Sequence, residues 1–261
     1  MNKRLILVLG VLVLLVSACG PVIRGSGHSV EESREVSGFD RVSLSGLGEL
    51  IITQGAEESL TIEAEDNLVR YIETEVRSGT LHIDFPDEPR RVNVIPTDPV
   101  RFYLTVKQLS GLSMSGAGRI GASSLKVDDV QISISGAGDV DLGSLTAKEL
   151  DIRVSGAGDI DIDALEADEL TLRLSGAGDV DIAGQVKAQQ ASLSGLGSYG
   201  AGDLESQTAK ITISGAGGAK VHVTEELDVR ISGAGSVKYY GNPTVSKDIS
   251  GLGKVSALGE R

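Results

Sequence analysis

Residues 132–182 decide the fold, and they read ISISGAGDVDLGSLTAKELDIRVSGAGDIDIDALEADELTLRLSGAGDVDI. The tetrad Ser-Gly-Ala-Gly recurs in this stretch with constant spacing, beginning at Ser135, Ser155 and Ser175. Outward from it, the pattern Ser-Gly-(Ala/Leu)-Gly continues with nearly the same spacing up to Ser250 and back to Ser115, with one earlier copy at Ser45. Such a regular period is typical of a repeat architecture in which each unit stacks on the one before.

Within each unit, apolar and polar residues alternate. Residues 152–154 read Ile-Arg-Val before one tetrad, and residues 159–162 read Asp-Ile-Asp-Ile after it. Alternation with period two predicts strands with one buried face. Because a propeller blade needs about 40–45 residues, we predict instead an all-β chain that forms a parallel β-solenoid (β-helix), right-handed, with coils of about 18–20 residues. The tetrad glycines then mark a bend where a side chain would clash or φ must be positive.

Composition narrows the class of protein. Lys and Arg number 24 against 37 Asp and Glu, and the net charge of −13 argues against a protein that binds nucleic acid. The single Cys excludes an intrachain disulfide and a multi-thiolate metal site. The tetrad serines have no recurring His beside them to act as a base. We therefore predict a protein that is not an enzyme, with no catalytic residues, no metal site and no cofactor.

Residues 1–18 have the features of a signal peptide. Two basic residues precede an apolar run at residues 5–16, whose length as a helix is about 18 Å, short of the ~30 Å hydrocarbon core of a bilayer. The run ends in Val16-Ser17-Ala18-Cys19, which resembles the lipobox of bacterial lipoproteins. The resemblance implies lipid attachment at Cys19, an ordinary signal peptide being the alternative. We expect an extracytoplasmic, membrane-anchored lipoprotein, on the outer membrane or cell surface if the host is Gram-negative.

We divide the chain into a signal peptide at 1–18, a flexible tether at 19–36 and one solenoid domain at 37–261. The tether is polar, holds Gly, Pro and Ser, and shows no sustained period. Within the domain, residues 37–110 are expected to form irregular coils and an N-terminal cap, and residues 111–261 the regular repeats. In the irregular part, strands are expected near 41–45, 49–53, 58–64, 72–77, 80–85, 92–95 and 100–106, with a helical turn at 67–71 and a tight turn at 77–80.

Several motifs of the domain together resemble one known family. They are Phe39-Asp40, the stretch GELIITQG at 48–55, Asp66-Asn67-Leu68 and the Ser-Gly-Ala-Gly-Asp-Val units. Over roughly residues 37–261 the chain is similar to the head-GIN domain family of auto-transporter adhesins, which is common among bacterial lipoproteins. The resemblance implies a β-helical, extracytoplasmic domain and carries over no catalytic residues.

Stacking at this period predicts a candidate acidic surface. Carboxylates ~5 Å apart repel by ~0.8 kcal/mol in bulk water and by several-fold more near a protein surface, so raised pKa values, a bound cation or adjacent basic residues must relieve them. Arg119 falls in the first column one coil earlier, and Lys220 and Lys238 fall in the second column in later coils. We interpret the surface as a solvated face, with calcium binding or a partner surface as alternatives. The six aspartates form two columns, Asp139, Asp159, Asp179 and Asp141, Asp161, Asp181.

These features favour a lipid-anchored, non-catalytic β-solenoid that serves as a surface adhesion, binding or structural scaffold. The expected partners are the membrane, through the lipid, and a glycan or protein surface as ligand. One alternative is a polysaccharide-active β-helix enzyme with paired Asp residues as acid and base, although the repeats offer few aromatic platforms, namely Tyr199, Tyr239 and Tyr240. Another alternative is an envelope sensor or regulatory partner domain.

Overall fold

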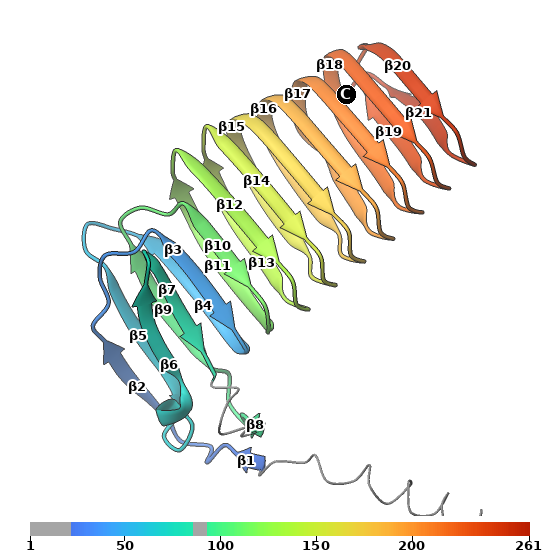
Figure 1. Cartoon of the computed structure of the whole chain (residues 1–261). Coiled ribbons are helices and arrows are strands. Elements are labelled where there is room, and N and C mark those ends of the chain that lie inside the picture. Colours follow the sequence, from blue (N-terminus) through green and yellow to red (C-terminus); the bar gives the residue numbers. More distant parts are fainter. Residues whose placement is uncertain (1–21, 86–92) are drawn as a thin grey trace, which may run out of the picture.

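The structure is a computed structural model that describes residues 22–85 and 93–261. Within these residues the chain winds into a stack of β-coils that follow one another along a single axis (Figure 1). One sheet joins 19 strands, and β1 (Val22–Arg24) pairs separately with β8 (Asn93–Ile95). The predicted signal peptide at 1–18 and the predicted lipid-attachment residue Cys19 lie outside the described residues.

The regular part of the stack confirms the predicted parallel β-solenoid. Ile132 pairs with Ile152, and Ile152 pairs with Leu172, so that equivalent residues of successive coils are neighbours. The early coils contain two strands each, whereas from β15 to β18 one long, bent strand runs through most of each coil. The strands are β10 (Gly111–Met114), β11 (Ala117–Lys126), β12 (Asp129–Ile134), β13 (Asp139–Thr146), β14 (Glu149–Val154), β15 (Ile160–Leu174), β16 (Val180–Leu193), β17 (Ser198–Ile213), β18 (Gly218–Ile231), β19 (Ser236–Tyr240), β20 (Thr244–Ile249) and β21 (Lys254–Gly259).

The core consists of the inward residues of the alternating pattern. Val140, Ile160 and Val180 follow one another in register, and each is almost completely buried. Burying one such aliphatic side chain contributes roughly 1.5–3 kcal/mol, and every coil repeats the contribution. Tyr199 occupies the next position of the same column and is also buried.

The hydroxyl of Tyr199 is satisfied inside the stack. It donates to Gln189 Oε1 at 2.8 Å, and Gln189 Nε2 donates to Ser206 Oγ at 2.8 Å. Ser206 Oγ in turn donates to the carbonyl oxygen of His222 at 2.9 Å. Burial raises the pKa of Tyr199, so its hydroxyl stays protonated. Tyr199 is therefore a core residue, and it is not a surface platform for a sugar.

The tetrad glycines are required by the close approach of successive coils. A Cβ atom on Gly136, Gly156 or Gly176 would overlap the backbone carbonyl oxygen of the equivalent glycine one coil earlier. Positive φ angles occur in only one of the described tetrads, at Gly46 (φ 113°) and Gly48 (φ 132°). In the regular coils, the tetrad positions therefore require glycine because the coils pack closely, and not because φ is positive.

The tetrad serines satisfy backbone groups at the same corner. Ser135 Oγ donates to the carbonyl oxygen of Met114 at 3.4 Å, and Ser155 Oγ donates to that of Ile134 at 3.4 Å. Ser175 Oγ makes the equivalent bond to Val154 at 3.3 Å. These hydroxyls link each coil to the one before.

The N-terminal cap begins with the coil formed by β3 (Arg41–Ser45) and β4 (Leu47–Gln54), on which β10 and β11 stack. On the other side of this coil, β7 (Thr80–Asp84) and β9 (Arg101–Val106) pair with it in parallel. Antiparallel strands then close the end of the stack: β5 (Ser59–Glu65) on β9, β6 (Glu73–Arg77) on β7, and β2 (Ser29–Arg34) on β5. These strands agree closely with the predicted ones.

The two predicted turns of the cap are also present. The 3₁₀ turn η1 (Val69–Tyr71) lies within the range expected to be helical. Between β6 and β7, Ser78 and Gly79 both have positive φ angles, of 51° and 76°, as a two-residue hairpin turn of type I′ requires.

The prediction of a flexible tether at 19–36 was wrong from Val22 onward, because β1 already pairs with β8. Residues 29–34 form β2, which pairs with residues 60–65 of β5 over six positions. The alternation in SVEESR is too polar to be recognised as a strand, because β2 packs on the outside of the cap and buries little of its surface. The folded domain therefore begins before residue 37.

The C-terminal end differs from the capped end. The last coil consists of β20 and β21, which pair with β18 and β19 on one side only among the described residues. Ile249, Leu252 and Leu258 are exposed there. Lys247 occupies an inward position, since its partner in the preceding coil is the buried Val229. An inward charge discourages further strand pairing at a sheet edge.

Candidate functional site

The predicted acidic columns are present as ladders. Asp141, Asp161 and Asp181 are register neighbours, and Asp139 lies opposite Arg119 of the preceding coil. In the second column, Asp181 is followed by Gly200 and then by Lys220 and Lys238. The positions expected for the flanking basic residues are therefore confirmed.

In the first column, the carboxylates accept hydrogen bonds from the backbone of the next coil. The Asp159 N–H donates to Asp139 Oδ1 at 3.3 Å, and the Asp179 N–H donates to Asp159 Oδ1 at 2.7 Å. At the end of the column, Ser198 donates both its N–H (2.8 Å) and its hydroxyl (2.7 Å) to Asp179 Oδ1. Backbone dipoles thus stabilise the negative charges, in addition to the basic residues that flank the columns.

The second column is compensated less well. Partial burial, and then the neighbouring carboxylates of Asp181 and Asp141, raise the pKa of Asp161. Burial and Asp179 raise the pKa of Asp181, while Lys220 acts in the opposite direction. Arg119 relieves the other end, with its Nε 3.4 Å from Asp141 Oδ2. Gly200 leaves room for the Asp181 carboxylate, which a Cβ atom at that position would overlap.

The chemistry open to this surface is limited. Within residues 22–85 and 93–261, no group of three or more His, Cys, Asp or Glu side chains is placed to hold a metal ion. The carboxylates of the first column are committed to backbone N–H groups. The arrangement suits a solvated, negatively charged face on the coils.

A groove on a different face was not identified from the sequence. It is lined by the tetrad serines, by the outward residues two positions before them and by the apolar residues between the two, over six successive coils. Hydroxyl groups of Ser133, Ser192 and Thr212 line it, and Arg153 and Arg173 lie at its middle. The sequence does show that Arg153 and Arg173 occupy equivalent positions of two successive repeats, which indicates that the two basic side chains are neighbours. The neighbouring Asp151 and its role could not be inferred without the register.

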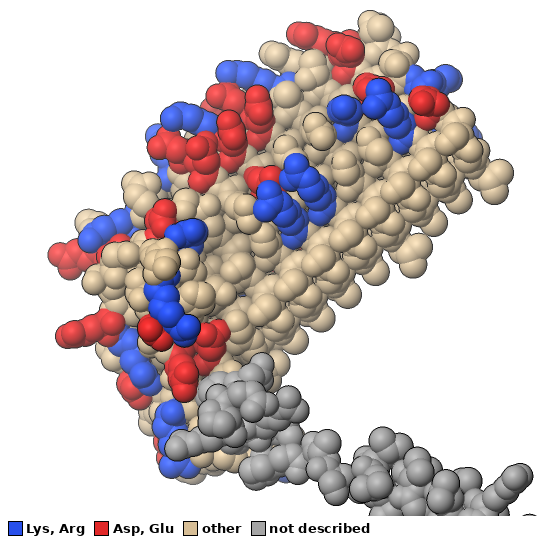
Figure 2. Space-filling model, in the orientation of Figure 1, with Lys and Arg blue, Asp and Glu red and all other residues tan. Residues whose placement is uncertain are grey.

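The surface beside this groove carries little charge. The tetrads stack into one long edge of the solenoid, and none of them contains a charged residue. Figure 2 shows a band without any Lys, Arg, Asp or Glu that follows one long edge of the stack, while charged side chains gather in separate patches elsewhere on this side. Leu196 and Leu252 replace the tetrad Ala and are 74% and 90% exposed.

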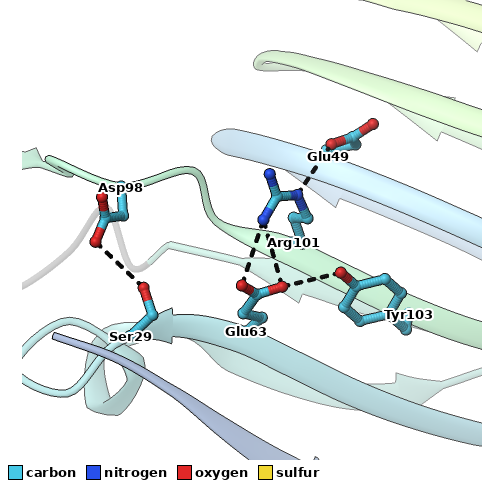
Figure 3. Close-up of polar contacts among 6 residues, drawn as sticks. All are labelled: Ser29, Glu49, Glu63, Asp98, Arg101 and Tyr103. Atoms are coloured by element: carbon cyan, nitrogen blue, oxygen red, sulfur yellow. Dashed lines mark hydrogen bonds and ion pairs between the residues drawn. The ribbon is translucent and has the colours of Figure 1, made fainter.

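A polar cluster in the cap is structural (Figure 3). Arg101 on β9 lies between Glu63 of β5 and Glu49 of β4, with nitrogen–oxygen distances of 3.3 and 3.5 Å. The Tyr103 hydroxyl donates to Glu63 at 2.9 Å, which raises the pKa of Tyr103, and the Glu63 carboxylate raises the pKa of Arg101. These contacts tie the antiparallel cap strand β5 to the first coil, as the separate contact of Ser29 with Asp98 ties β2 to the segment before β9.

The geometry defines a class of protein: a parallel β-solenoid with columns of like residues on its outer faces. Within this class, the family model described as "Putative auto-transporter adhesin, head GIN domain" matches residues 38–164 and 143–243. The chain belongs to this family, as its motifs predicted. No curated protein matches the chain.

Several solved structures have the same fold. A protein of Parabacteroides distasonis described as a putative lipid binding protein is 26% identical, with a TM-score of 0.87 over 91% of this chain and 99% of that one. A putative adhesin of Parabacteroides merdae is 21% identical, with a TM-score of 0.84 over 92% and 100% of the two chains. Another, from Bacteroides fragilis, is 24% identical, with a TM-score of 0.70 over 90% and 100%.

Membership of this family supports an adhesion-like, non-catalytic role and a surface or extracytoplasmic location. Within the described residues, no helix is long and apolar enough to span a bilayer.

Proposed function

We propose that this protein is a lipid-anchored, non-catalytic adhesion scaffold of the cell envelope. The observation that carries the proposal is the parallel stack of a head-GIN domain, which repeats the Ser-Gly-(Ala/Leu)-Gly tetrad at the same edge of successive coils. A surface of this kind offers many equivalent contacts to a repetitive ligand, so that weak contacts add up.

The proposed anchor is Cys19, and its place in the chain sets the geometry. Only Gly20 and Pro21 separate Cys19 from β1, and β1 is already paired with β8. Since an extended residue spans at most ~3.6 Å, the lipid would hold the N-terminal segment close to the membrane. The regular coils and the C-terminal end would then be the parts presented to a partner. Each buried CH₂ of an acyl chain contributes ~0.8 kcal/mol, so two or three chains anchor the protein stably.

Cell fractionation tests the anchor. Cys19→Ala should move the protein from the membrane fraction to the soluble fraction or leave it unprocessed, whereas the control Ser17→Ala should stay on the membrane. Cells that display the wild-type protein should also adhere to a glycan-coated or cell-coated surface better than cells with Cys19→Ala. A Cys19→Ala protein that is correctly cleaved and still resists a high-salt wash would refute the lipid anchor.

A hydrolase acting on polysaccharides is the second candidate. It is favoured by the register pair Asp141 and Asp161, because glycoside hydrolysis uses two neighbouring carboxyl groups as acid and base, and burial together with the nearby carboxylates raises the pKa of Asp161. Asp161→Asn would abolish cleavage of a polysaccharide panel if this were the function, whereas Asp129→Asn, on another strand, would not. An absence of cleavage by the wild-type protein would remove this candidate.

A further inference from the structure

We infer that the hydroxyl-lined groove binds a linear anionic glycan, whose acid groups are held by Arg153 and Arg173. The inference rests on the proposed binding role and adds to it the site and the chemical class of ligand. The groove crosses the ends of β10, β12, β14, β15, β16 and β17, and its two halves share Arg173 and Ser175.

The hydroxyl groups of the groove repeat in two rows. One row consists of tetrad serines such as Ser135, Ser155 and Ser175, each of which uses its hydrogen in a bond to the preceding coil. Their oxygen lone pairs remain as acceptors. The other row contains Ser133, Ser192 and Thr212, which can donate as well as accept. Register neighbours lie ~4.8 Å apart, close to the length of one sugar residue in an extended glycan.

The two arginines give the groove its charge. Arg153 and Arg173 are register neighbours and share the carboxylate of Asp151. Asp151 Oδ1 lies 3.1 Å from Arg153 Nε, and Asp151 Oδ2 lies 2.9 Å from Arg173 Nη1. Two guanidinium groups on one carboxylate leave a net charge of +1. The groove itself is lined by no Asp or Glu among the described residues.

Arg173 has free capacity to bind an anion. Arg153 is also held by Gln131 at 2.9 Å, whereas Asp151 is the one polar partner of Arg173 within the part of the chain that the structure describes. The side chain of Arg173 is 53% exposed. A guanidinium group presents five N–H donors and matches a carboxylate or sulfate in a bidentate manner. The basic side chains near the middle of the face in Figure 2 stand apart from its larger acidic patches.

The rest of the molecule indicates which anion would bind. Among the residues that the structure describes, no aromatic side chain lines the groove, so a neutral sugar has no ring on which to stack. The chain carries a net charge of −13, which disfavours a polyphosphate that would wrap widely around it. A glycan with spaced acid groups satisfies both conditions, since its hydroxyls meet the serine rows and its acids meet the arginines.

A binding titration on the detergent-solubilised full chain tests the inference. The probes are polygalacturonate, dextran sulfate and neutral dextran. We expect one or both anionic probes to bind, binding to weaken as NaCl is raised, and neutral dextran to bind at least about tenfold more weakly. Binding of polygalacturonate alone would assign carboxylates as the acid groups, and binding of dextran sulfate alone would assign sulfates.

Variants locate the site. The double variant Arg153→Gln with Arg173→Gln should bind the anionic probe about tenfold or more weakly than the wild-type protein, because two charge-assisted contacts are lost. Arg230→Gln is the matched control: Arg230 lies in the same column, paired with Thr212, but outside the groove lining. Unchanged thermal unfolding of both variants would show that the fold is intact.

Three results would overturn the inference: no binding of either anionic probe, equal binding by the double variant, or equal binding of poly-L-glutamate, which would reduce the effect to charge alone. Failure of the inference differs from failure of the proposed function. In the first case cells that display the protein still adhere while the purified chain ignores anionic glycans, and in the second case adhesion and anchoring themselves are lost.

Discussion

Within residues 29–110, the antiparallel strands β2, β5 and β6 cover the end of the stack, whereas from Gly111 onward all strands pair in parallel with the neighbouring coils. The cap uses contacts that occur once, such as the buried Glu65, which accepts hydrogen bonds from the N–H groups of Gly27 (2.6 Å) and Thr97 (2.9 Å) and from the Thr97 hydroxyl. The coils use contacts that recur, such as the glycine approach and the serine bond at each corner.

The difference shows two ways of stabilising one solenoid. In the coils the same interface is repeated, so each coil depends on its neighbours and no single polar contact is essential. In the cap, one carboxylate joins segments that are 38 and 32 residues away in the sequence. The ends differ as well, because the cap covers the apolar core, whereas the last coil carries Lys247 at an inward position.

Deletions should have the largest effect and test the independence of the coils. Removing residues 136–155 joins Ser135 to Gly156 and takes out one whole coil, so the remaining strands keep their register. We expect a folded, shorter domain. Removing only residues 136–145 leaves half a coil, places every following strand out of register and should prevent folding. Circular dichroism and thermal unfolding measure both, and equal unfolding of the two proteins would contradict the repeat model.

A single methyl group at the coil corner should have the next largest effect. Gly156→Ala places Cβ against the backbone carbonyl of Gly136, which cannot rotate away, and should destabilise the domain by about 3 kcal/mol. Gly121→Ala is the matched control, because the nearest atom to its Cβ is the carbonyl oxygen of Asp141 at 3.9 Å. Chemical denaturation compares the two. A stable Gly156→Ala protein would show that the coils can separate locally.

Loss of Glu65 should loosen the cap alone. Glu65→Ala leaves the N–H groups of Gly27 and Thr97 without their acceptor and should lower the thermal midpoint of the cap by several degrees. Hydrogen exchange should show faster exchange in β2 and β5 and unchanged protection in β15 and β16. The exposed Glu57→Ala, which removes the same charge, should have little effect. Faster exchange throughout the stack would show that cap and coils unfold together.

The same residue predicts how the cap responds to acid. Burial alone would raise the pKa of Glu65, but the hydrogen bonds from Thr97, Gly27 and Asp98 outweigh it and lower the pKa below its ordinary value. The contribution of Glu65 to stability is therefore present above the pKa of the unfolded state and is lost as the pH falls through the folded pKa. The stability of the Glu65→Gln variant should therefore fall less steeply in acid than that of the wild-type protein, as measured by thermal unfolding at several pH values.

The smallest effect is expected in the acidic columns, and it has the opposite sign. Because the pKa values of Asp161 and Asp181 are raised, the wild-type protein gains stability as the pH falls through these values. The double variant Asp161→Asn with Asp181→Asn should be more stable at neutral pH, by less than about 1 kcal/mol. The gain should vanish in acid. Thermal unfolding at several pH values measures it.

The other acidic column supplies the matched control. Asp139→Asn with Asp159→Asn removes two charges but keeps side-chain oxygens that can accept the backbone N–H groups, so a smaller gain is expected. A different result would indicate a calcium site instead of a solvated face. In that case millimolar calcium would raise the thermal midpoint of the wild-type protein by several degrees, and the rise would be lost when all six aspartates are changed to Asn.

Much of the fold could be predicted because it is periodic. The spacing of the tetrads and the alternation around Ile160 are enough to place the strands and their buried faces. The acidic columns and their flanking basic residues follow by the same rule. Where the period fails, prediction also fails: β2 was taken for a tether, and Tyr199, which was counted among the few possible aromatic platforms, fills an aliphatic column.

By itself the sequence therefore determined the parallel solenoid, the stacking of equivalent residues and the family, since a short, regular repeat with period-two alternation leaves one way to bury its apolar face. Only the tertiary structure decided the contacts between different columns. Asp151 joins Arg153, two residues away, to Arg173, 22 residues away, and Glu65 joins segments of the cap on either side of it. Such contacts depend on side-chain direction and on long excursions of the chain, and neither is recorded in a local pattern.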